Sequence, residues 1–156
     1  MRLCAGLLVS VGAAFANGAC AQEIPEPYSE YFATIERIID GDTLEVRVAL
    51  WPGLEAINAV RVRGIDAPEV RGADCPEEKL WAQEAKAQAE RLYSVGTTVR
   101  LENVELDSFG RAVADVRRWR SDRWLYFADE MIERDMAKDW LPDELDINWC
   151  ELLTKK

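Results

Sequence analysis

The sequence predicts an α+β domain in which a five-stranded β-barrel of the oligonucleotide/oligosaccharide-binding (OB) type carries two to three helices. Five segments alternate apolar and polar residues with the period of two that half-buried strands require, and turn dipeptides separate them. One longer segment has helical spacing and stands between the third and fourth strands. Three strands, a helix, two strands and another helix are an order that a small OB-type barrel accommodates.

The first three strands are expected over residues 33–39, 43–50 and 57–65. An Asp-Gly dipeptide follows the first strand and favours a tight hairpin, and a Pro-Gly dipeptide ends the second. In the third strand two valines alternate with Arg61 and Arg63. This pattern indicates strands with one face in the core and one in solvent.

A helix is expected from Pro76 to about Tyr93. Proline is favoured at the first helical position, and the two glutamates after it suit the positive end of the helix dipole. Its apolar face should contain Leu80, Trp81, Ala85, Ala89 and Leu92.

The last two strands are expected over residues 97–106 and 112–119, and a second helix should begin at Ser121 and Asp122. The core side of that helix should contain Leu125, Ala128, Met131, Ile132 and Met136.

The N-terminus has the layout of a secretory signal peptide. Arg2 supplies a positive charge, residues 3–15 are uncharged and mostly apolar, and Ala19, Cys20 and Ala21 fit a cleavage site. The apolar run is too short to cross a membrane. Cleavage would leave a periplasmic or secreted protein without membrane contact. A buried N-terminal helix and a lipoprotein acylated at Cys20 are the alternatives.

The expected organisation is therefore a signal peptide (1–21), a flexible leader (22–32), the barrel domain (33–140) and an acidic C-terminal tail (141–156). Cleavage leaves two cysteines, Cys75 and Cys150, and a pair in an exported domain is expected to form a disulfide. That bond would tie the tail to the domain. Two buried free thiols are the alternative.

Composition excludes several kinds of site. The chain has no histidine, which rules out Ser-His-Asp triads and His-ligated zinc or haem. The formal charge is −10, and becomes −11 once Arg2 is removed with the leader. A protein this acidic is not expected to coat DNA non-specifically, because such binding depends on Lys and Arg contacts to phosphates.

Two acidic clusters follow strands, one with Asp40 and Asp42, the other with Asp66 and Glu69. Two carboxylates and a backbone carbonyl suit Ca²⁺ or Mg²⁺, and a further carboxylate could polarise a water molecule. Arginines beside such a site could bind a phosphate and neutralise charge in the transition state. Each motif alone is usually a turn, a loop or a solvated face. The candidate arginines are Arg61, Arg63 and Arg111.

Three stretches in one order resemble the signature of the thermonuclease (staphylococcal nuclease-like) family: IDGDTL (39–44), VRVRGIDAPE (60–69) and FGR (109–111). The resemblance extends from about Thr34 to Lys138. It implies an SNase-like OB barrel and a Ca²⁺-dependent phosphodiesterase acting on DNA or RNA, with Mg²⁺ or Mn²⁺ as other possible ions. The protein is expected to be a monomer.

The same resemblance implies roles for individual residues. Asp42 and Asp66 would hold the metal through their carboxylates, and Thr43 through its backbone carbonyl. Glu69 would be the general base on the attacking water.

Arg61 and Arg111 would bind the scissile phosphate, and Arg111 would also favour departure of the 5′-oxygen. Asp40 and Asp107 would support the site. Well-known members have a lysine-tyrosine pair before the Gly-Arg motif. This sequence has Ser-Phe there, so Phe109 lacks the hydroxyl.

Residues 111–123 contain five arginines and two acids, with tryptophans between them. Such interleaving is typical of single-strand binders, although a solvated strand edge with core tryptophans would have the same pattern. A catalytically weak nuclease-fold module that binds protein or single-stranded nucleic acid is therefore the alternative function. A purely structural domain has no positive feature in its favour. The expected additional substrate contacts are Arg63, Phe109, Arg117, Arg118 and Arg120.

Overall fold

The computed structural model describes residues 30–141 and 147–154. The expected signal peptide (1–21) and most of the expected leader lie outside these residues, as does part of the acidic tail. The first strand begins at Glu30, so the pattern-based start at residue 33 is three residues late.

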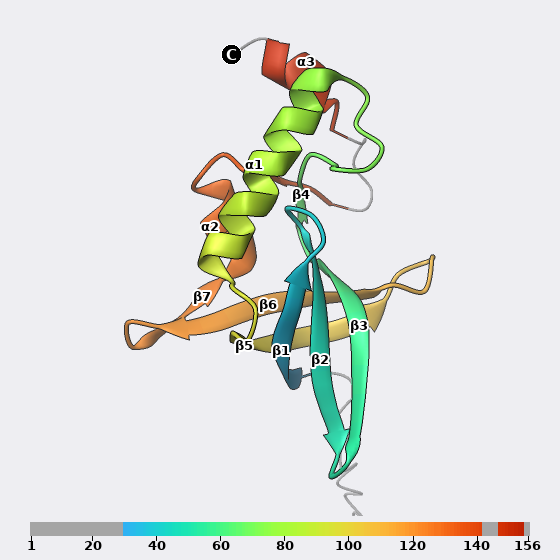
Figure 1. Cartoon of the computed structure of the whole chain (residues 1–156), viewed down its shortest axis with the longest axis vertical. Coiled ribbons are helices and arrows are strands. Elements are labelled where there is room, and N and C mark those ends of the chain that lie inside the picture. Colours follow the sequence, from blue (N-terminus) through green and yellow to red (C-terminus); the bar gives the residue numbers. More distant parts are fainter. Residues whose placement is uncertain (1–29, 142–146, 155–156) are drawn as a thin grey trace, which may run out of the picture.

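Five strands form the closed barrel that the sequence predicts (Figure 1). Antiparallel pairing runs in the order β3-β2-β1-β5-β6, and a parallel pairing of β3 with β6 closes the sheet. The strands are β1 (Glu30–Ile38), β2 (Thr43–Trp51), β3 (Leu54–Val62), β5 (Thr98–Leu106) and β6 (Ala112–Arg120).

The barrel interior contains the apolar residues of the alternating pattern. Ile35, Leu44, Val46 and Val99 have no solvent exposure. Because strand side chains alternate between faces, the intervening charged residues point outward, where many form ion pairs such as Arg37 with Glu45.

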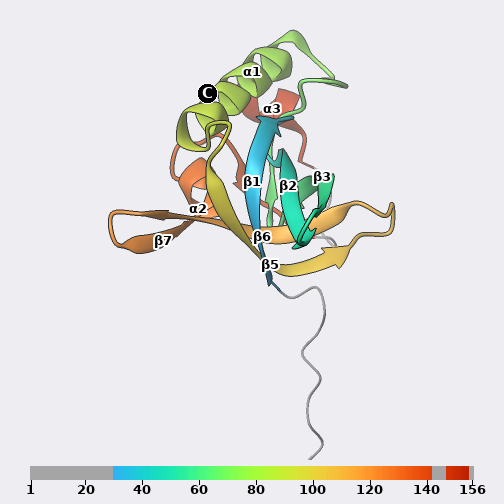
Figure 2. The same cartoon turned by 60° about the horizontal axis from the view of Figure 1, so that its bottom comes forward.

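Helix α1 (Pro76–Leu92) packs across one end of the barrel, and α3 (Trp149–Thr154) lies beside it (Figures 1 and 2). Alanines form the buried face of α1: Ala82, Ala85 and Ala89 are fully buried. Leu80, expected on that face, is 65% exposed. The small side chains let the helix approach the barrel closely.

The expected helix start at Ser121 and Asp122 is wrong. Both residues have positive φ (52° and 60°) and form a two-residue hairpin turn between β6 and β7 (Arg123–Tyr126). Helix α2 begins only at Phe127 and ends at Ile132. Ser and Asp are favoured both at helix N-caps and in turns, so local sequence does not separate the two outcomes.

Two short strands lie outside the barrel. β4 (Ile65–Asp66) pairs with β8 (Lys138–Asp139), which brings the chain after α2 alongside the segment that follows β3. Among the described helices, none has the length and apolar character needed to cross a membrane.

Candidate active site

Asp42, Arg61 and Asp66 come from three different segments and meet at one end of the barrel. The β2–β3 register pairs Thr43 with Arg61, which places the preceding Asp42 next to that arginine. Arg61 Nη1 donates to Asp42 Oδ2 at 2.9 Å, and Nη2 donates to Asp66 Oδ1 at 3.0 Å. One guanidinium therefore joins the two carboxylates that the sequence predicts as metal ligands.

Asp42 is the most enclosed member of this group, at 4% exposure. Besides Arg61, the Thr43 hydroxyl donates to its Oδ1 at 2.8 Å and the Ala67 N–H to its Oδ2 at 3.0 Å. Burial raises the pKa of Asp42, while Arg61 and these two hydrogen bonds oppose the rise. A cation beside Asp42 is thus what stabilises its charged form.

The Thr43 carbonyl, the expected metal-binding oxygen, takes part in the β1–β2 turn. This oxygen accepts the N–H groups of Ile39 and Asp40 at 2.9 and 3.2 Å. Two donors therefore already occupy this oxygen. Thr43 instead contributes its hydroxyl to Asp42.

Glu69 follows β4 on an exposed loop. Partial desolvation raises the pKa of its carboxyl group, and the negative charges of Asp40, Asp42 and Asp66 raise it further. The loop that carries Glu69 begins at Asp66, and its Ala67 N–H binds Asp42 Oδ2 at 3.0 Å. A carboxylate in such surroundings accepts a proton more readily than a free one.

A buried glutamate holds the loop that carries Glu69, and sequence reasoning missed it. Glu78, 7% exposed, accepts the N–H groups of Glu69 at 3.4 Å and Asp74 at 2.8 Å. Asp40 binds the same loop by accepting the Val70 N–H at 3.4 Å. A glutamate three residues after a helix N-cap often accepts backbone N–H groups, but the N-cap here is a cysteine, so the sequence signal is weak.

Arg111 lies on the β5–β6 turn and is held there by Asp107. Its Nε donates to Asp107 Oδ2 at 2.7 Å, and Asp107 Oδ1 accepts the N–H groups of Phe109 and Arg111. These hydrogen bonds, above all the one from the Arg111 backbone N–H, lower the pKa of Asp107, although desolvation raises it. Within the described residues no hydrogen bond or ion pair joins Arg111 to the Arg61 cluster.

Residues 59–143 match the sequence model of the family described as "Staphylococcal nuclease homologue". The chain belongs to this family. The match confirms the predicted family and, with the closed barrel, the predicted fold. No curated protein matches the chain.

The family match covers part of the nuclease-fold site. Arg61, Asp66, Glu69 and Arg111 fall inside it, whereas Asp42 precedes it. It is the strand pairing in the structure that places Asp42 with the matched residues.

The arginines expected to bind substrate have different surroundings. Arg118 is 7% exposed and forms an ion pair with Glu130, so it cannot reach a nucleic acid at the surface. Arg117 pairs with Glu102, and Arg63 with Glu105. Of the five residues expected to make additional substrate contacts, Phe109 and Arg120 are exposed.

A disulfide joins Cys75 to Cys150, the two cysteines expected to pair. The carboxylate of Glu78 lies within 4.8 Å of both sulfurs. Sulfurs bonded to each other are not thiolates, so this group does not form a soft-metal site in the oxidised protein. Residue Trp149 adjoins Cys150 and donates from Nε1 to Asp66 Oδ2 at 2.8 Å, a contact that no sequence pattern indicated.

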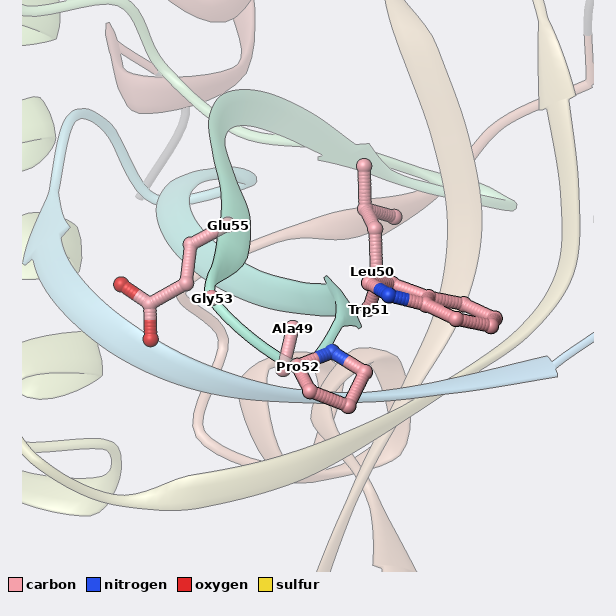
Figure 3. A pocket seen from close by; sticks show the side chains of 6 residues that line it. All are labelled: Ala49, Leu50, Trp51, Pro52, Gly53 and Glu55. Carbon is pink, nitrogen blue, oxygen red and sulfur yellow. The ribbon is translucent and has the colours of Figure 1, made fainter.

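A shallow hollow at the β2–β3 turn lies away from this site (Figure 3). Trp51 and Leu50 line it and are 73% and 50% exposed. Glu55, the ionisable residue among those that line it, points away from Trp51 (Figure 3). The hollow lacks the convergent polar groups of a catalytic site.

Proposed function

We propose that this nuclease-fold protein is an exported, divalent-cation-dependent phosphodiesterase that hydrolyses DNA or RNA. The observation that carries the proposal is that Asp42 Oδ2 and Asp66 Oδ1 face the same cationic group, the guanidinium of Arg61. Glu69 follows Asp66 by three residues, on a loop whose Ala67 N–H binds Asp42, and partial desolvation and the charges of both aspartates raise its pKa. This combination of two acids, a cation position, a third acid and an arginine fits phosphate chemistry.

The residues fit a hard divalent ion. Asp42 and Asp66 already share one positive charge, and carboxylate oxygens suit Ca²⁺, Mg²⁺ or Mn²⁺. Since Thr43 is occupied, the Ala67 carbonyl is the better backbone candidate: within the described residues no hydrogen bond uses it, and the Ala67 N–H already binds Asp42. When bound, the ion would supply positive charge for an oxygen of the scissile phosphate.

The protein's own residues would divide the remaining work. Glu69 would accept a proton from the attacking water, whose oxygen forms the new bond to phosphorus. The bond from phosphorus to the leaving oxygen breaks, and that oxygen takes up a proton. Arg61 would bind the phosphate, and Arg111 would do so after releasing Asp107. Both arginines would neutralise charge as it builds on the phosphoryl oxygens.

Export is part of the proposal. The layout of residues 1–21 supports it, and so does the Cys75–Cys150 disulfide, because disulfides persist in oxidising compartments. The periplasm or the extracellular space is the proposed location.

The function is tested by incubating metal-stripped protein with plasmid DNA and with RNA, each in Ca²⁺, Mg²⁺, Mn²⁺ or EDTA. We expect cleavage with at least one ion and none in EDTA. Full activity in EDTA would contradict the metal requirement. Absence of cleavage with every ion would favour the second function.

That second function is a binding module for single-stranded nucleic acid. The β6–β7 hairpin favours it, because Trp119 is 57% exposed at its edge and Arg120 and Arg123 stand exposed beside it. Loss of oligonucleotide binding in Arg120→Ala/Arg123→Ala, in a protein without nuclease activity, would support the module. Arg37→Ala, an exposed arginine on β1, is the matched control.

A further inference from the structure

Each carboxylate oxygen of Asp66 has its own donor. Oδ1 accepts Arg61 Nη2 at 3.0 Å, and the same guanidinium binds Asp42 through Nη1. Oδ2 accepts Trp149 Nε1 at 2.8 Å. The two donors approach different oxygens, so the carboxylate is fixed in rotation.

Trp149 is well suited to fix Asp66 because its indole offers one donor and no acceptor. The residue is 6% exposed, so its N–H needs a partner inside the protein. Asp66 Oδ2 is that partner. The contact leaves Oδ1 to the Arg61 guanidinium, which also binds Asp42.

The residue that follows Trp149 is held by a covalent bond. Helix α3 (Trp149–Thr154) has six residues, too few to be stable alone. The adjacent Cys150 is bonded to Cys75, the N-cap of α1, and α3 lies against that helix (Figure 1). The disulfide thus fixes the residue next to the indole that binds Asp66.

The aromatic neighbour of Arg61 comes from the same C-terminal side. The backbone N–H of Trp140 donates to the Gly64 carbonyl at 3.0 Å. The Arg61 guanidinium lies 5.8 Å from the Trp140 ring centroid. The chain that follows α2 therefore borders both partners of the Asp66–Arg61 pair. Trp149 lies beyond the family match at residues 59–143 and next to the disulfide-bonded Cys150.

We propose that Trp149 is a positioning residue for Asp66, and that the Cys75–Cys150 disulfide holds it in place. This inference rests on the proposed function, in which Asp66 is a metal ligand. Hydrogen bonds to the second oxygen of a ligating carboxylate set its orientation, and their loss typically weakens metal binding about 10–100-fold. The metal site is then complete only in the oxidised protein, which fits an enzyme that works outside a reducing compartment.

The test measures Ca²⁺ affinity by isothermal titration calorimetry on metal-stripped protein without substrate. Trp149→Phe keeps the ring and removes the donor, and we expect its Ca²⁺ Kd to rise by about 10–100-fold. Trp119→Phe, on the exposed β6 edge, is the matched control and should keep the wild-type Kd. Urea unfolding without Ca²⁺ verifies that each variant is folded.

The disulfide is tested with Cys75→Ala/Cys150→Ala and with the same pair combined with Trp149→Phe. If the disulfide acts through Trp149, the cysteine variant should itself raise the Ca²⁺ Kd, and the combined variant should lose no more affinity than Trp149→Phe alone, because one contact is lost in both. A wild-type Kd in the cysteine variant, or additive losses in the combined variant, would overturn the role of the disulfide. Should the cysteine variant prove partly unfolded, Trp149→Phe with the disulfide intact still decides the role of Trp149.

The outcomes separate this inference from the proposed function. A Trp149→Phe protein that binds Ca²⁺ with the wild-type Kd overturns the inference, even if the wild type cleaves nucleic acid. A wild type that binds Ca²⁺ but cleaves nothing contradicts the proposed function, while weaker Ca²⁺ binding in Trp149→Phe still supports the inference. Absence of Ca²⁺ binding in the wild type overturns the inference about Trp149.

Discussion

Arg118 and Glu130 form a two-pronged ion pair in the protein interior. Arg118 Nε lies 2.9 Å from Glu130 Oε2, and Nη2 lies 2.5 Å from Oε1. The Tyr93 hydroxyl donates to the same glutamate at 2.8 Å, and its ring centroid lies 4.6 Å from the guanidinium carbon. This cluster joins β6, α2 and the end of α1. It explains why an arginine within a basic stretch serves stability rather than substrate binding.

Removing one partner of this pair should strongly destabilise the fold. Glu130→Ala leaves Arg118 buried without its carboxylate, and we expect a loss of about 3–5 kcal/mol in the free energy of unfolding. Glu133→Ala, at the exposed C-cap of α2, should change it by less than about 0.5 kcal/mol. Urea unfolding monitored by circular dichroism measures both. Equal effects in the two variants would contradict the structural role of the pair.

The same glutamate makes stability depend on pH. Burial raises the pKa of Glu130, but the hydrogen bonds from Arg118 and Tyr93 outweigh it, so the pKa lies below the ordinary value of 4.5. A depressed pKa contributes stability above the unfolded-state value, and this contribution disappears as pH falls through the folded-state pKa. Urea unfolding between pH 7 and about pH 3 should show this loss of stability at acidic pH in the wild type and a smaller loss in Glu130→Gln. If the free energy of unfolding falls equally with pH in both proteins, Glu130 is not the source of the loss.

Gly41 allows α1 to pack against the turn that carries Asp42. A Cβ at this position would lie 2.8 Å from the Ala67 Cβ and 3.0 Å from the Ala85 Cβ. Gly41→Ala should therefore destabilise the protein by about 1–3 kcal/mol and also reduce activity, because the turn must shift. Thermal unfolding and a cleavage assay measure the two effects. Wild-type values in both would show that α1 can move away without consequence.

Glu78 holds the loop that carries Glu69 through two backbone hydrogen bonds. Glu78→Gln keeps the size of the side chain but replaces one acceptor oxygen with an NH₂ group. We expect kcat to fall roughly ten- to a hundredfold with little change in KM, because the general base is misplaced rather than removed. Glu77→Gln, exposed on the same helix turn, is the control. A rise in KM with kcat unchanged would place Glu78 in substrate binding instead.

Local pattern predicted the barrel because the buried parts of its strands alternate apolar and polar residues. Leu44, Val46 and Val60 are buried where the period of two requires it, and the turn dipeptides fall between strands. The hairpin at Ser121 was missed because the same residue types start helices and make turns. The choice between them depends on pairing of β7 with β6, which is a tertiary effect.

The candidate site was predictable in its residues but only partly in its contacts. The motifs identified Asp42, Arg61 and Asp66, and the structure brings them together. The motifs gave no sign that the β1–β2 turn already uses the Thr43 carbonyl, the expected backbone ligand. Trp149 could not be found from sequence, since its partner Asp66 is 83 residues away and belongs to a different segment.

The most direct test of the proposed function is the turnover of Glu69→Gln on a plasmid substrate in the activating cation. Glu84→Gln, an exposed glutamate on α1, is the matched control. We predict that Glu69→Gln loses about 10²–10⁴-fold in kcat while keeping the wild-type unfolding curve, because loss of a general base removes roughly that factor. Turnover in Glu69→Gln equal to that of the wild type and of Glu84→Gln would contradict the account.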